Sequence, residues 1–227
     1  MLSESQKKRV EHILRECDLP SYDTDTFNDI GLETLRVFRG VLPPDRTITS
    51  PAFARFLHLN KTLYQNKSVL EVGSGSGILS VVMAKHGAKS VLATDITDAC
   101  VKNTQENTKI LDLNEIIDVR KGDLFEPINE ERFDLIVFAH PIYCDKPTKG
   151  SGLEIAIMDD GGLIRRFLTE AKTYLKPGGK LLLPFNEAAG EGNHPRTHAE
   201  NHGYETKRLA SLDANNGNMF VYELTPK

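Results

Sequence analysis

The sequence predicts an α/β fold in which a doubly wound, mostly parallel sheet carries helices on both faces. Between residues 67 and 184, short apolar runs alternate with segments of helical periodicity, an order typical of parallel strands joined by crossover helices. Residues 204–224 are typical instead of two strands that meet near Asn215, Asn216 and Gly217, which predicts a C-terminal antiparallel hairpin. Residues 4–17 space their apolar side chains helically between charges and predict an N-terminal helical extension.

The elements between these ends follow one another regularly. Ser50 and Pro51 resemble a cap and a helix-opening proline for a first helix over 52–59. Buried strands are then expected at 67–72, 90–96, 116–125, 133–139 and 180–185, and helices at 78–87, 98–113, 161–175 and 194–202. We divide the chain into the extension, residues 1–50, and a second domain, residues 51–227.

The amino-acid composition and charge indicate which kinds of partner and which cellular compartment to expect. The 227 residues carry 28 Lys and Arg against 32 Asp and Glu, so a net charge of −4 gives no general attraction for nucleic acid, which is not an expected partner. The charged N-terminus does not resemble an export signal, and no apolar run is long enough for a membrane span. Three cysteines without metal-ligand spacing suit a reducing compartment. We expect a cytoplasmic protein.

A glycine turn between the first buried strand and its helix predicts a ligand site. Gly73, Gly75 and Gly77 allow close approach of the backbone, and the helix N-terminus offers unpaired N–H groups. A dinucleotide fingerprint would place its third glycine at Ile78, and Glu71 would repel a pyrophosphate. A cationic ligand is favoured instead. S-adenosylmethionine carries both an ammonium and a sulfonium group, and we expect it as the cofactor.

Residues at the ends of the next strands extend this site. Asp95 ends the second strand, where a carboxylate can accept hydrogen bonds from both ribose hydroxyls, and Ile96 could pack on an adenine ring. Asp123 and Leu124 follow the third strand and offer an acceptor for the adenine amino group with an apolar neighbour. The predicted cofactor contacts are Glu71, Gly73, Ser74, Gly75, Gly77, Asp95, Ile96, Asp123 and Leu124.

Residues 67–184 resemble the class I S-adenosylmethionine-dependent methyltransferases. The family's glycine motif appears as EVGSGSG at 71–77, its ribose-binding acid in ATDI at 93–96, and its adenine segment as KGDLF at 121–125. The resemblance implies a Rossmann-like, seven-stranded sheet whose last strand is antiparallel. It also implies S-adenosylmethionine as the cofactor of residues 51–227, with residues 1–50 contributing to a lid over the methyl acceptor.

The fourth strand ends in a segment that resembles, with one difference, the Asn-Pro-Pro-Tyr motif of the HemK-like protein glutamine methyltransferases. His140, Pro141, Ile142 and Tyr143 occupy its four positions, and residues 157–183 are similar to that group's downstream segment. In that group, the asparagine side chain and the proline carbonyl orient an amide nitrogen. A neutral histidine offers one donor and one acceptor and can also take a proton.

We therefore expect His140 and Tyr143 to be catalytic, with His140 also touching the cofactor. The alternative for His140 is a hydrogen bond to the loop and contact with the cofactor through its backbone only.

Other polar residues have simpler interpretations. His194, His198 and His202 would share a helix face, but their polar surroundings favour an exposed helix, and we expect no metal. Asp159 could recognise a basic acceptor or cap the following helix. Arg166 is expected on a solvated helix face.

The function predicted first is methyl transfer to nitrogen or oxygen of a small molecule. The alternative is N-methylation of a protein, at a glutamine or in a ribosomal component. A third reading is a non-catalytic protein that binds S-adenosylmethionine. The acceptor is thus a small molecule or a protein, no membrane is expected as partner, and the sequence does not indicate an oligomeric state.

Overall fold

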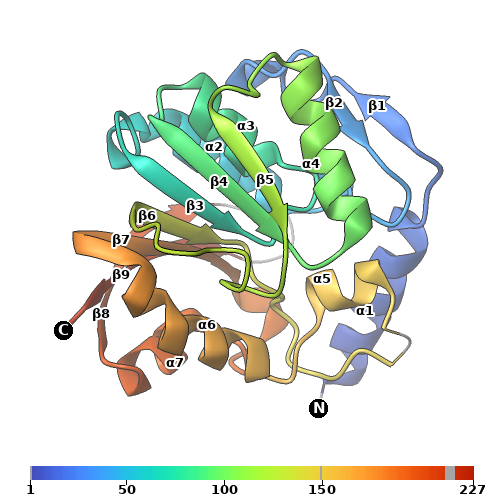
Figure 1. Ribbon diagram of the computed structural model, residues 1–227. Helices are drawn as coiled ribbons and strands as arrows, with labels where there is room; N and C mark the ends of the chain where they lie inside the picture. The colour runs from blue at the N-terminus through green and yellow to red at the C-terminus, as the bar shows by residue number, and fades with distance from the viewer. Residues whose placement is uncertain (1, 149, 213–217) are drawn as a thin grey trace.

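A seven-stranded sheet organises the protein in the computed structural model, which describes residues 2–148, 150–212 and 218–227 (Figure 1). The strand order is β5-β4-β3-β6-β7-β9-β8. Their bounds are β3 Ser68–Val72, β4 Ser90–Asp95, β5 Ile117–Lys121, β6 Phe133–Phe138, β7 Leu175–Asn186, β8 Tyr204–Leu212 and β9 Met219–Pro226. The first five are parallel, whereas β9 runs antiparallel to both β7 and β8. The predicted fold class is confirmed, although the turn expected at residues 215–217 lies outside the described residues.

Helices cover both faces of the sheet. One face carries α2 Thr49–Leu59, α3 Ile78–Lys85 and α4 Asp98–Ile110, and the other carries α6 Gly162–Tyr174 and α7 Pro195–Asn201 (Figure 1). The first of these helices starts slightly earlier than expected, since Ser50 and Pro51 lie inside its first turn rather than before it. Among the helices of the described ranges, none is long and apolar enough to cross a membrane.

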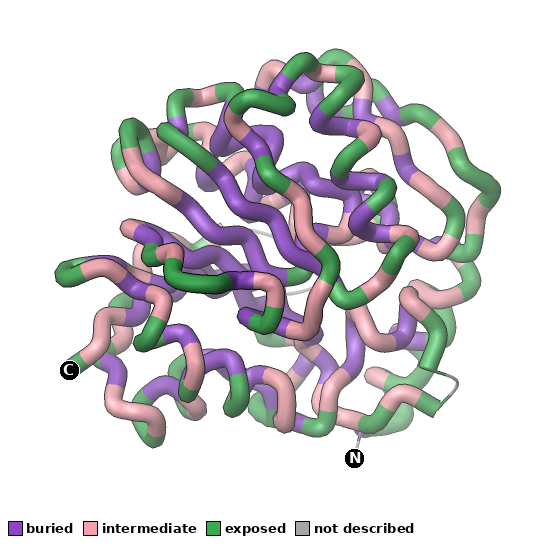
Figure 2. The backbone as a smooth tube through the Cα atoms, in the orientation of Figure 1, coloured by how far each residue is buried: buried purple, intermediate pink, exposed green. Residues whose placement is uncertain are grey.

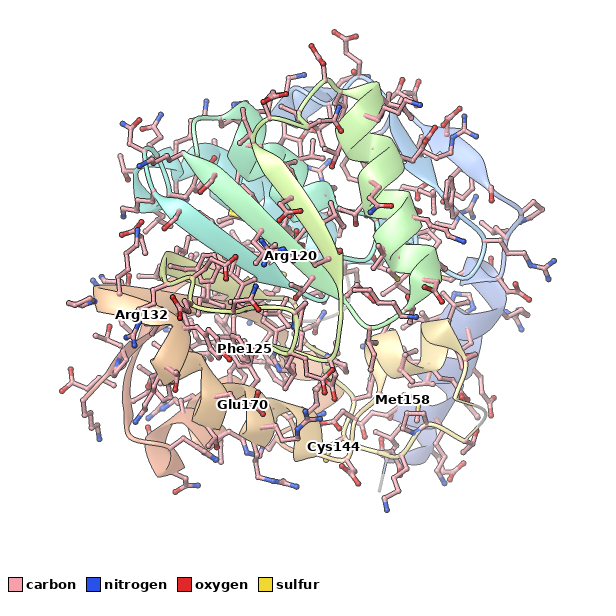
Figure 3. All side chains as sticks on the ribbon, in the orientation of Figure 1. Arg120, Phe125, Arg132, Cys144, Met158 and Glu170 are labelled. Carbon is pink, nitrogen blue, oxygen red and sulfur yellow. The ribbon has the colours of Figure 1, made fainter. Side chains whose placement is uncertain are left out.

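Successive side chains of the central strands point to opposite faces of the sheet, so the core has two layers. Val69 and Leu135 pack with α2 and α3, while Leu70 and Ile136, their neighbours in sequence, pack with α6. These strands are buried along their length (Figure 2). On the α6 side Phe125 is stacked on Tyr174, with ring centroids 4.7 Å apart, and points between the sheet and the helix (Figure 3). The sheet is thus covered on both sides, which leaves its strand ends free to build a site.

The N-terminal extension contains more than the expected helix. After α1 Glu4–Cys17, the strands β1 Tyr22–Thr24 and β2 Leu35–Val37 form a small antiparallel sheet. Two buried asparagines of α4 hold β2, because Asn107 Oδ1 accepts from Arg36 N at 2.7 Å and Asn103 Oδ1 from Phe38 N at 2.6 Å. Amide side chains satisfy the edge of this small sheet and attach the extension to the main domain.

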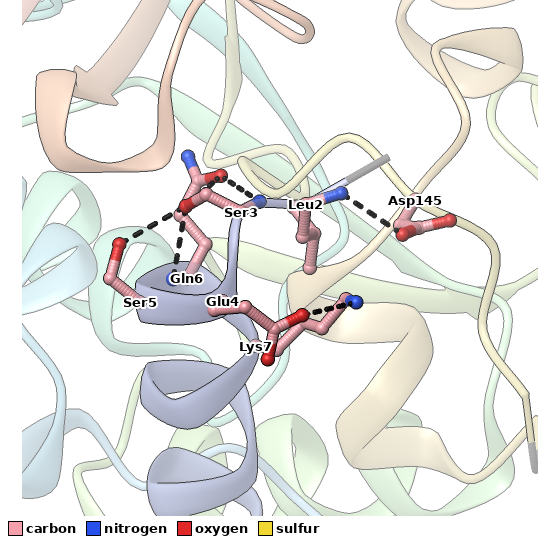
Figure 4. A network of polar contacts seen from close by, with 7 residues as sticks. All are labelled: Leu2, Ser3, Glu4, Ser5, Gln6, Lys7 and Asp145. Carbon is pink, nitrogen blue, oxygen red and sulfur yellow. Dashed lines mark hydrogen bonds and ion pairs between the residues drawn. The ribbon is translucent and has the colours of Figure 1, made fainter.

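The first helix docks on the segment that follows β6. A capping box joins Ser3 and Gln6 at the start of α1. Gln6 Nε2 also donates to the carbonyl of Ala189 at 2.7 Å. Leu2 N donates to Asp145 Oδ2 at 3.2 Å (Figure 4). The short helix α5 Gly152–Ile157 lies against α1 in the same region (Figure 1). Residues distant in sequence therefore meet beside the carboxyl end of β6.

Candidate active site

A cavity of about 490 Å³ lies where the parallel strands β3, β4 and β5 end. This edge is where open α/β sheets bind ligands. Eight predicted cofactor residues line it: Glu71, Gly73, Ser74, Gly75, Asp95, Ile96, Asp123 and Leu124. The structure thus brings together side chains from three strand ends, as the sequence predicted.

Gly77 is outside this lining but fixes the turn above it. The three motif glycines have φ values of +67° at Gly73, +55° at Gly75 and +80° at Gly77, a region that side chains strain to adopt. A Cβ at Gly77 would also lie 2.8 Å from Thr104 Cγ2 of α4. The glycine therefore allows α3 and α4 to pack closely while the turn stays against the cavity.

Asp95 connects two turns at the mouth of the cavity. Its Oδ2 accepts from Gly75 N at 3.0 Å, and its Oδ1 accepts from Thr97 N at 3.0 Å. Oδ1 also accepts from the Thr97 hydroxyl at 3.2 Å, so Oδ2 is the oxygen that keeps a lone pair for a ligand hydroxyl. Next to it Ile96 is 52% exposed, unusual for so apolar a side chain, and it offers a surface for a flat ring.

Glu71 of β3 lines the first cavity and is almost completely buried. Its Oε2 accepts from Ser80 N at 2.8 Å and from the Ser80 hydroxyl, so α3 already uses part of its hydrogen-bonding capacity. Burial raises the pKa of Glu71 to about 8, although the bonds from Ser80 oppose the shift. A cation in the cavity would favour the ionised form of this carboxyl.

Arg166 is exposed on its helix, as the sequence predicted, but it also has a partner that the sequence did not indicate. It lines the cavity, and its Nη1 lies 2.9 Å from Asp123 Oδ2. The helical pattern of α6 gave the correct face, but it could not reveal a partner 43 positions away that follows a different strand. Asp123 therefore meets any ligand as part of an ion pair.

A second cavity of about 330 Å³ adjoins the first. The two share Leu42, Ser50, Ala139 and Ala156 in their walls. The second cavity is built mostly from residues 9–13 and 42–50, together with the segment after β6. The sequence analysis expected residues 1–50 to contribute to a lid over the methyl acceptor, and residues of this range form much of the wall, while their role as a lid stays a prediction.

His140 and Tyr143 line the second cavity and are absent from the first. Pro141, which lies between them in sequence, borders the first cavity, whereas Ile142 borders the second. The structure does not place His140 in the wall of the predicted cofactor cavity.

The imidazole of His140 is buried in its neutral form. Nε2 donates to the carbonyl of Asn193 at 3.0 Å, and the Phe138 backbone also bonds with the ring, which is almost completely buried. Burial lowers the pKa of His140 to about 4. Burial also raises the pKa of Tyr143, while a hydrogen bond with Arg9 opposes that shift.

Asn193 holds this segment and was missed at the sequence level. Its fully buried Nδ2 donates to the carbonyls of Pro141 at 3.1 Å and of Asp159 at 2.9 Å. It lies just before α7, where no local pattern relates it to residues 52 positions earlier. One amide thus fixes the chain on both sides of α5.

Asp159, for which two roles were open, caps α6. Its Oδ2 accepts from Gly161 N at 2.9 Å and from Leu163 N at 3.0 Å. Asp159 also contributes to the wall of the first cavity. The structure therefore supports the capping role directly.

The three histidines of the predicted row have separate protein partners. His194 Nε2 lies 3.2 Å from the Tyr222 hydroxyl, His198 Nε2 lies 2.9 Å from the carbonyl of Gly192, and His202 Nδ1 lies 2.7 Å from the carbonyl of His198. Within the described part of the chain, no group of three or more His, Cys, Asp or Glu residues is arranged to hold a metal ion.

Charge decides which ligand fits the first cavity. Four carboxyl groups line it, from Glu71, Asp95, Asp123 and Asp159, against the single guanidinium of Arg166. A ligand with a positive charge, a ribose and a flat ring would find carboxyl groups for its charge, acceptors for its ribose hydroxyls and the exposed side chain of Ile96 for its ring. The sheet order, the glycine turn and the acids at successive strand ends define the class I S-adenosylmethionine-dependent methyltransferase fold.

Sequence comparison agrees with this class. A family model described as ribosomal protein L11 methyltransferase (PrmA) matches residues 55–142. A relative from Methanocaldococcus jannaschii, provisionally named protein N5-glutamine methyltransferase, is 34% identical over 132 residues, 56% of this chain and 66% of its own length. The ribosomal protein L11 methyltransferase of Lactobacillus johnsonii is 44% identical over 81 residues, 36% of this chain and 25% of its own. The chain thus spans less than two thirds of the length of these relatives.

Solved structures share the fold. The 16S rRNA methyltransferase RsmC of T. thermophilus, in complex with AdoMet and guanosine, has a TM-score of 0.65 at 19% identity and covers 91% of this chain and 50% of its own. The ribosomal protein L11 methylase of Lactobacillus delbrueckii subsp. bulgaricus has a TM-score of 0.56 at 21% identity, with 78% of each chain covered. The chain therefore has the class I S-adenosylmethionine-dependent methyltransferase fold, and part of its sequence is similar to methyltransferases.

Proposed function

We propose that the chain transfers a methyl group from S-adenosylmethionine to a nitrogen atom of a protein, with ribosomal proteins as the first acceptors to test. The observation that carries the proposal is the pair of adjoining cavities with the His140–Tyr143 segment between them. The first suits a cationic nucleoside, and the second is a separate place for an acceptor. A protein acceptor is favoured over a small molecule because the relatives named above are protein methyltransferases.

Binding and orientation account for most of what the chain would contribute. S-adenosylmethionine supplies a methyl group that is already activated by its sulfonium charge. Asp95 and the glycine turn would hold the nucleoside, while the second cavity would align the acceptor nitrogen and exclude water. His140, neutral and almost completely buried in the wall of the second cavity, would help to hold the segment against which that nitrogen lies.

Two hydrogen-bonding groups of the proposed acceptor site differ from those of the HemK-like group. Where that group has an asparagine amide, His140 directs Nε2 to the Asn193 carbonyl. The Pro141 carbonyl, which orients the amide in that group, already accepts from Asn193 Nδ2. Any acceptor nitrogen would therefore share the Pro141 oxygen and meet an imidazole, so we do not assign glutamine as the methylated residue.

The proposal is tested by incubating the chain with methyl-labelled S-adenosylmethionine and, separately, ribosomal proteins, ribosomal RNA and small metabolites. Label in protein, lost in the Asp95→Ala variant, is the expected result. Label confined to metabolites or to RNA would contradict a protein acceptor, and the RNA arm is needed because RsmC is named as a 16S rRNA enzyme. Cofactor binding without transfer to any of the three would support a non-catalytic role instead.

A further inference from the structure

The two adjoining cavities carry opposite charge. The first is lined by four carboxyl groups and one guanidinium. The second has the guanidinium groups of Arg9 and Arg46 and the imidazole of His12 in its wall, and no acidic residue among its described lining residues. This basic wall occurs in a chain whose net charge is −4. Local positive charge at a concave site favours an anionic group in the ligand.

The two arginines of the second cavity come from different elements. Arg9 lies on α1, and its side chain bonds with Tyr143 of the segment after β6. Arg46 ends the short helix Pro44–Arg46 and is exposed. The carboxylate nearest to it in sequence, Asp45, accepts a hydrogen bond from the Tyr22 hydroxyl at 2.6 Å. Arg46 also hydrogen-bonds the Tyr22 hydroxyl, which leaves its other guanidinium N–H groups for an incoming anion.

Apolar side chains occupy much of the remaining wall. Ile13, Ile48, Ile142 and Ile157 line it, from four separate segments. An apolar surface with a few cationic groups is suited to an uncharged side chain that has a charged neighbour. A lysine ammonium would face like charges from the two arginines, which raises the cost of its entry.

We propose that the second cavity binds a protein segment in which an acidic residue stands next to the methylated one. Arg46, assisted by Arg9, would pair with the acidic side chain, while the acceptor nitrogen would lie beside the His140–Tyr143 segment. Guanidinium groups bind carboxylates through two parallel hydrogen bonds, which would fix the register of the segment as well as attract it. This inference rests on the proposed methyl transfer to protein and adds the chemistry by which the acceptor is selected.

The test uses synthetic peptides as probes with the full chain and labelled S-adenosylmethionine. One set carries a central glutamine and one a central lysine, each flanked either by glutamates or by lysines. We expect the wild-type chain to methylate an acid-flanked peptide at least about tenfold faster than its base-flanked partner, mainly through a lower KM. Raising salt from about 50 mM to about 500 mM should reduce this preference.

Arg46→Gln should reduce the preference to less than about threefold, because its charge is lost. Arg15→Gln is the matched control, since Arg15 is exposed on α1 and does not line the cavity. It should keep the wild-type preference. Unchanged circular dichroism and unchanged binding of S-adenosylhomocysteine by both variants would show that neither substitution alters the fold or the first cavity.

The outcomes separate the two proposals. Methylation of acid-flanked and base-flanked peptides at equal rates, or an undiminished preference in Arg46→Gln, would overturn the acidic-segment inference and leave protein methylation in place. Transfer to neither peptides nor ribosomal proteins would overturn both. Transfer to an RNA oligonucleotide alone would also overturn both, because the basic cavity would then serve phosphate groups.

Discussion

The first and second cavities touch along a shared wall, yet they are assembled in different ways. The first is built from the ends of three parallel strands and the turns that follow them, and its charges are mainly negative. The second is built mostly from residues 9–13 and 42–50, outside the range matched by the L11 methyltransferase model, and its charges are positive. Sheet geometry therefore fixes one site, whereas contacts between distant segments fix the other.

The largest effect expected in the first cavity concerns Glu71 and pH. Its pKa rises from 4.5 to about 8 on folding, so the folded state retains the proton that the unfolded state loses. The stability conferred by the protonated form is complete below about pH 4.5 and is lost as the pH rises toward 8. Glu71→Gln, which stays neutral, should therefore match the wild type in acid and exceed it by up to roughly 4 kcal/mol near pH 8.

Urea unfolding between about pH 5 and about pH 9 measures this difference. Glu115→Gln removes an exposed carboxyl group and serves as control. A constant gap between the Glu71→Gln variant and the wild type across this range would mean that Glu71 is not protonated in the folded protein.

In the second cavity, the largest effect should follow from Asn193→Ala. The substitution leaves the buried carbonyls of Pro141 and Asp159 without their donor, at a cost of about 3 kcal/mol in unfolding free energy. Asn201→Ala, which removes an amide bond to Thr197 at an exposed position of α7, should cost less than about 0.5 kcal/mol. Similar losses in the two variants would argue that Asn193 does not hold the segment.

Cofactor affinity should depend on Asp95. Asp95→Ala should weaken binding of S-adenosylmethionine by about 1.5 to 3 kcal/mol, because a charged acceptor at the mouth of the first cavity is removed. Asp98→Ala is the control, since that carboxylate points to Lys121 at 2.9 Å, outside the cavity. Calorimetry measures both constants, and equal affinity in Asp95→Ala and wild type would remove Asp95 from the site.

The smallest expected effect, a change in turnover, distinguishes the roles of the two cavities most clearly. His140→Ala should lower turnover about tenfold while changing cofactor affinity less than about threefold, because His140 borders only the second cavity. His198→Ala, which alters a histidine outside both linings, should leave both constants unchanged. A His140→Ala variant that loses cofactor affinity instead would place His140 functionally with the first cavity.

The sequence allowed the first cavity to be predicted because its residues follow from strand order. Parallel strands end at one edge, so Glu71, Asp95 and Asp123 had to approach one another once the strands were recognised. The sequence did not predict that Arg166 pairs with Asp123. The two residues belong to different elements, and helical periodicity does not show which residue of another element a side chain contacts. The small sheet of β1 and β2 was also missed, since its three-residue strands are too short for an alternating pattern.

The segments expected at the acceptor, residues 1–50 and 140–143, do line the second cavity, but its detailed walls could not be predicted, for a physical reason that Asn193 illustrates. Its three side-chain hydrogen bonds reach carbonyls 34 to 52 positions away, and a backbone carbonyl leaves no signature in the sequence. His140 and Tyr143 were recognised through their motif, but the side of the segment on which they lie depends on the backbone direction after β6.

The contribution of the N-terminal segment to the second cavity has a consequence for how such enzymes diversify. Loops and termini exchange more freely than sheet edges. Replacing this segment with one that carries other side chains would redirect the chemistry to a new target while the methyl donor stayed where it was. The cofactor site at the strand ends would then be retained, and selectivity for the acceptor could change independently of it during evolution.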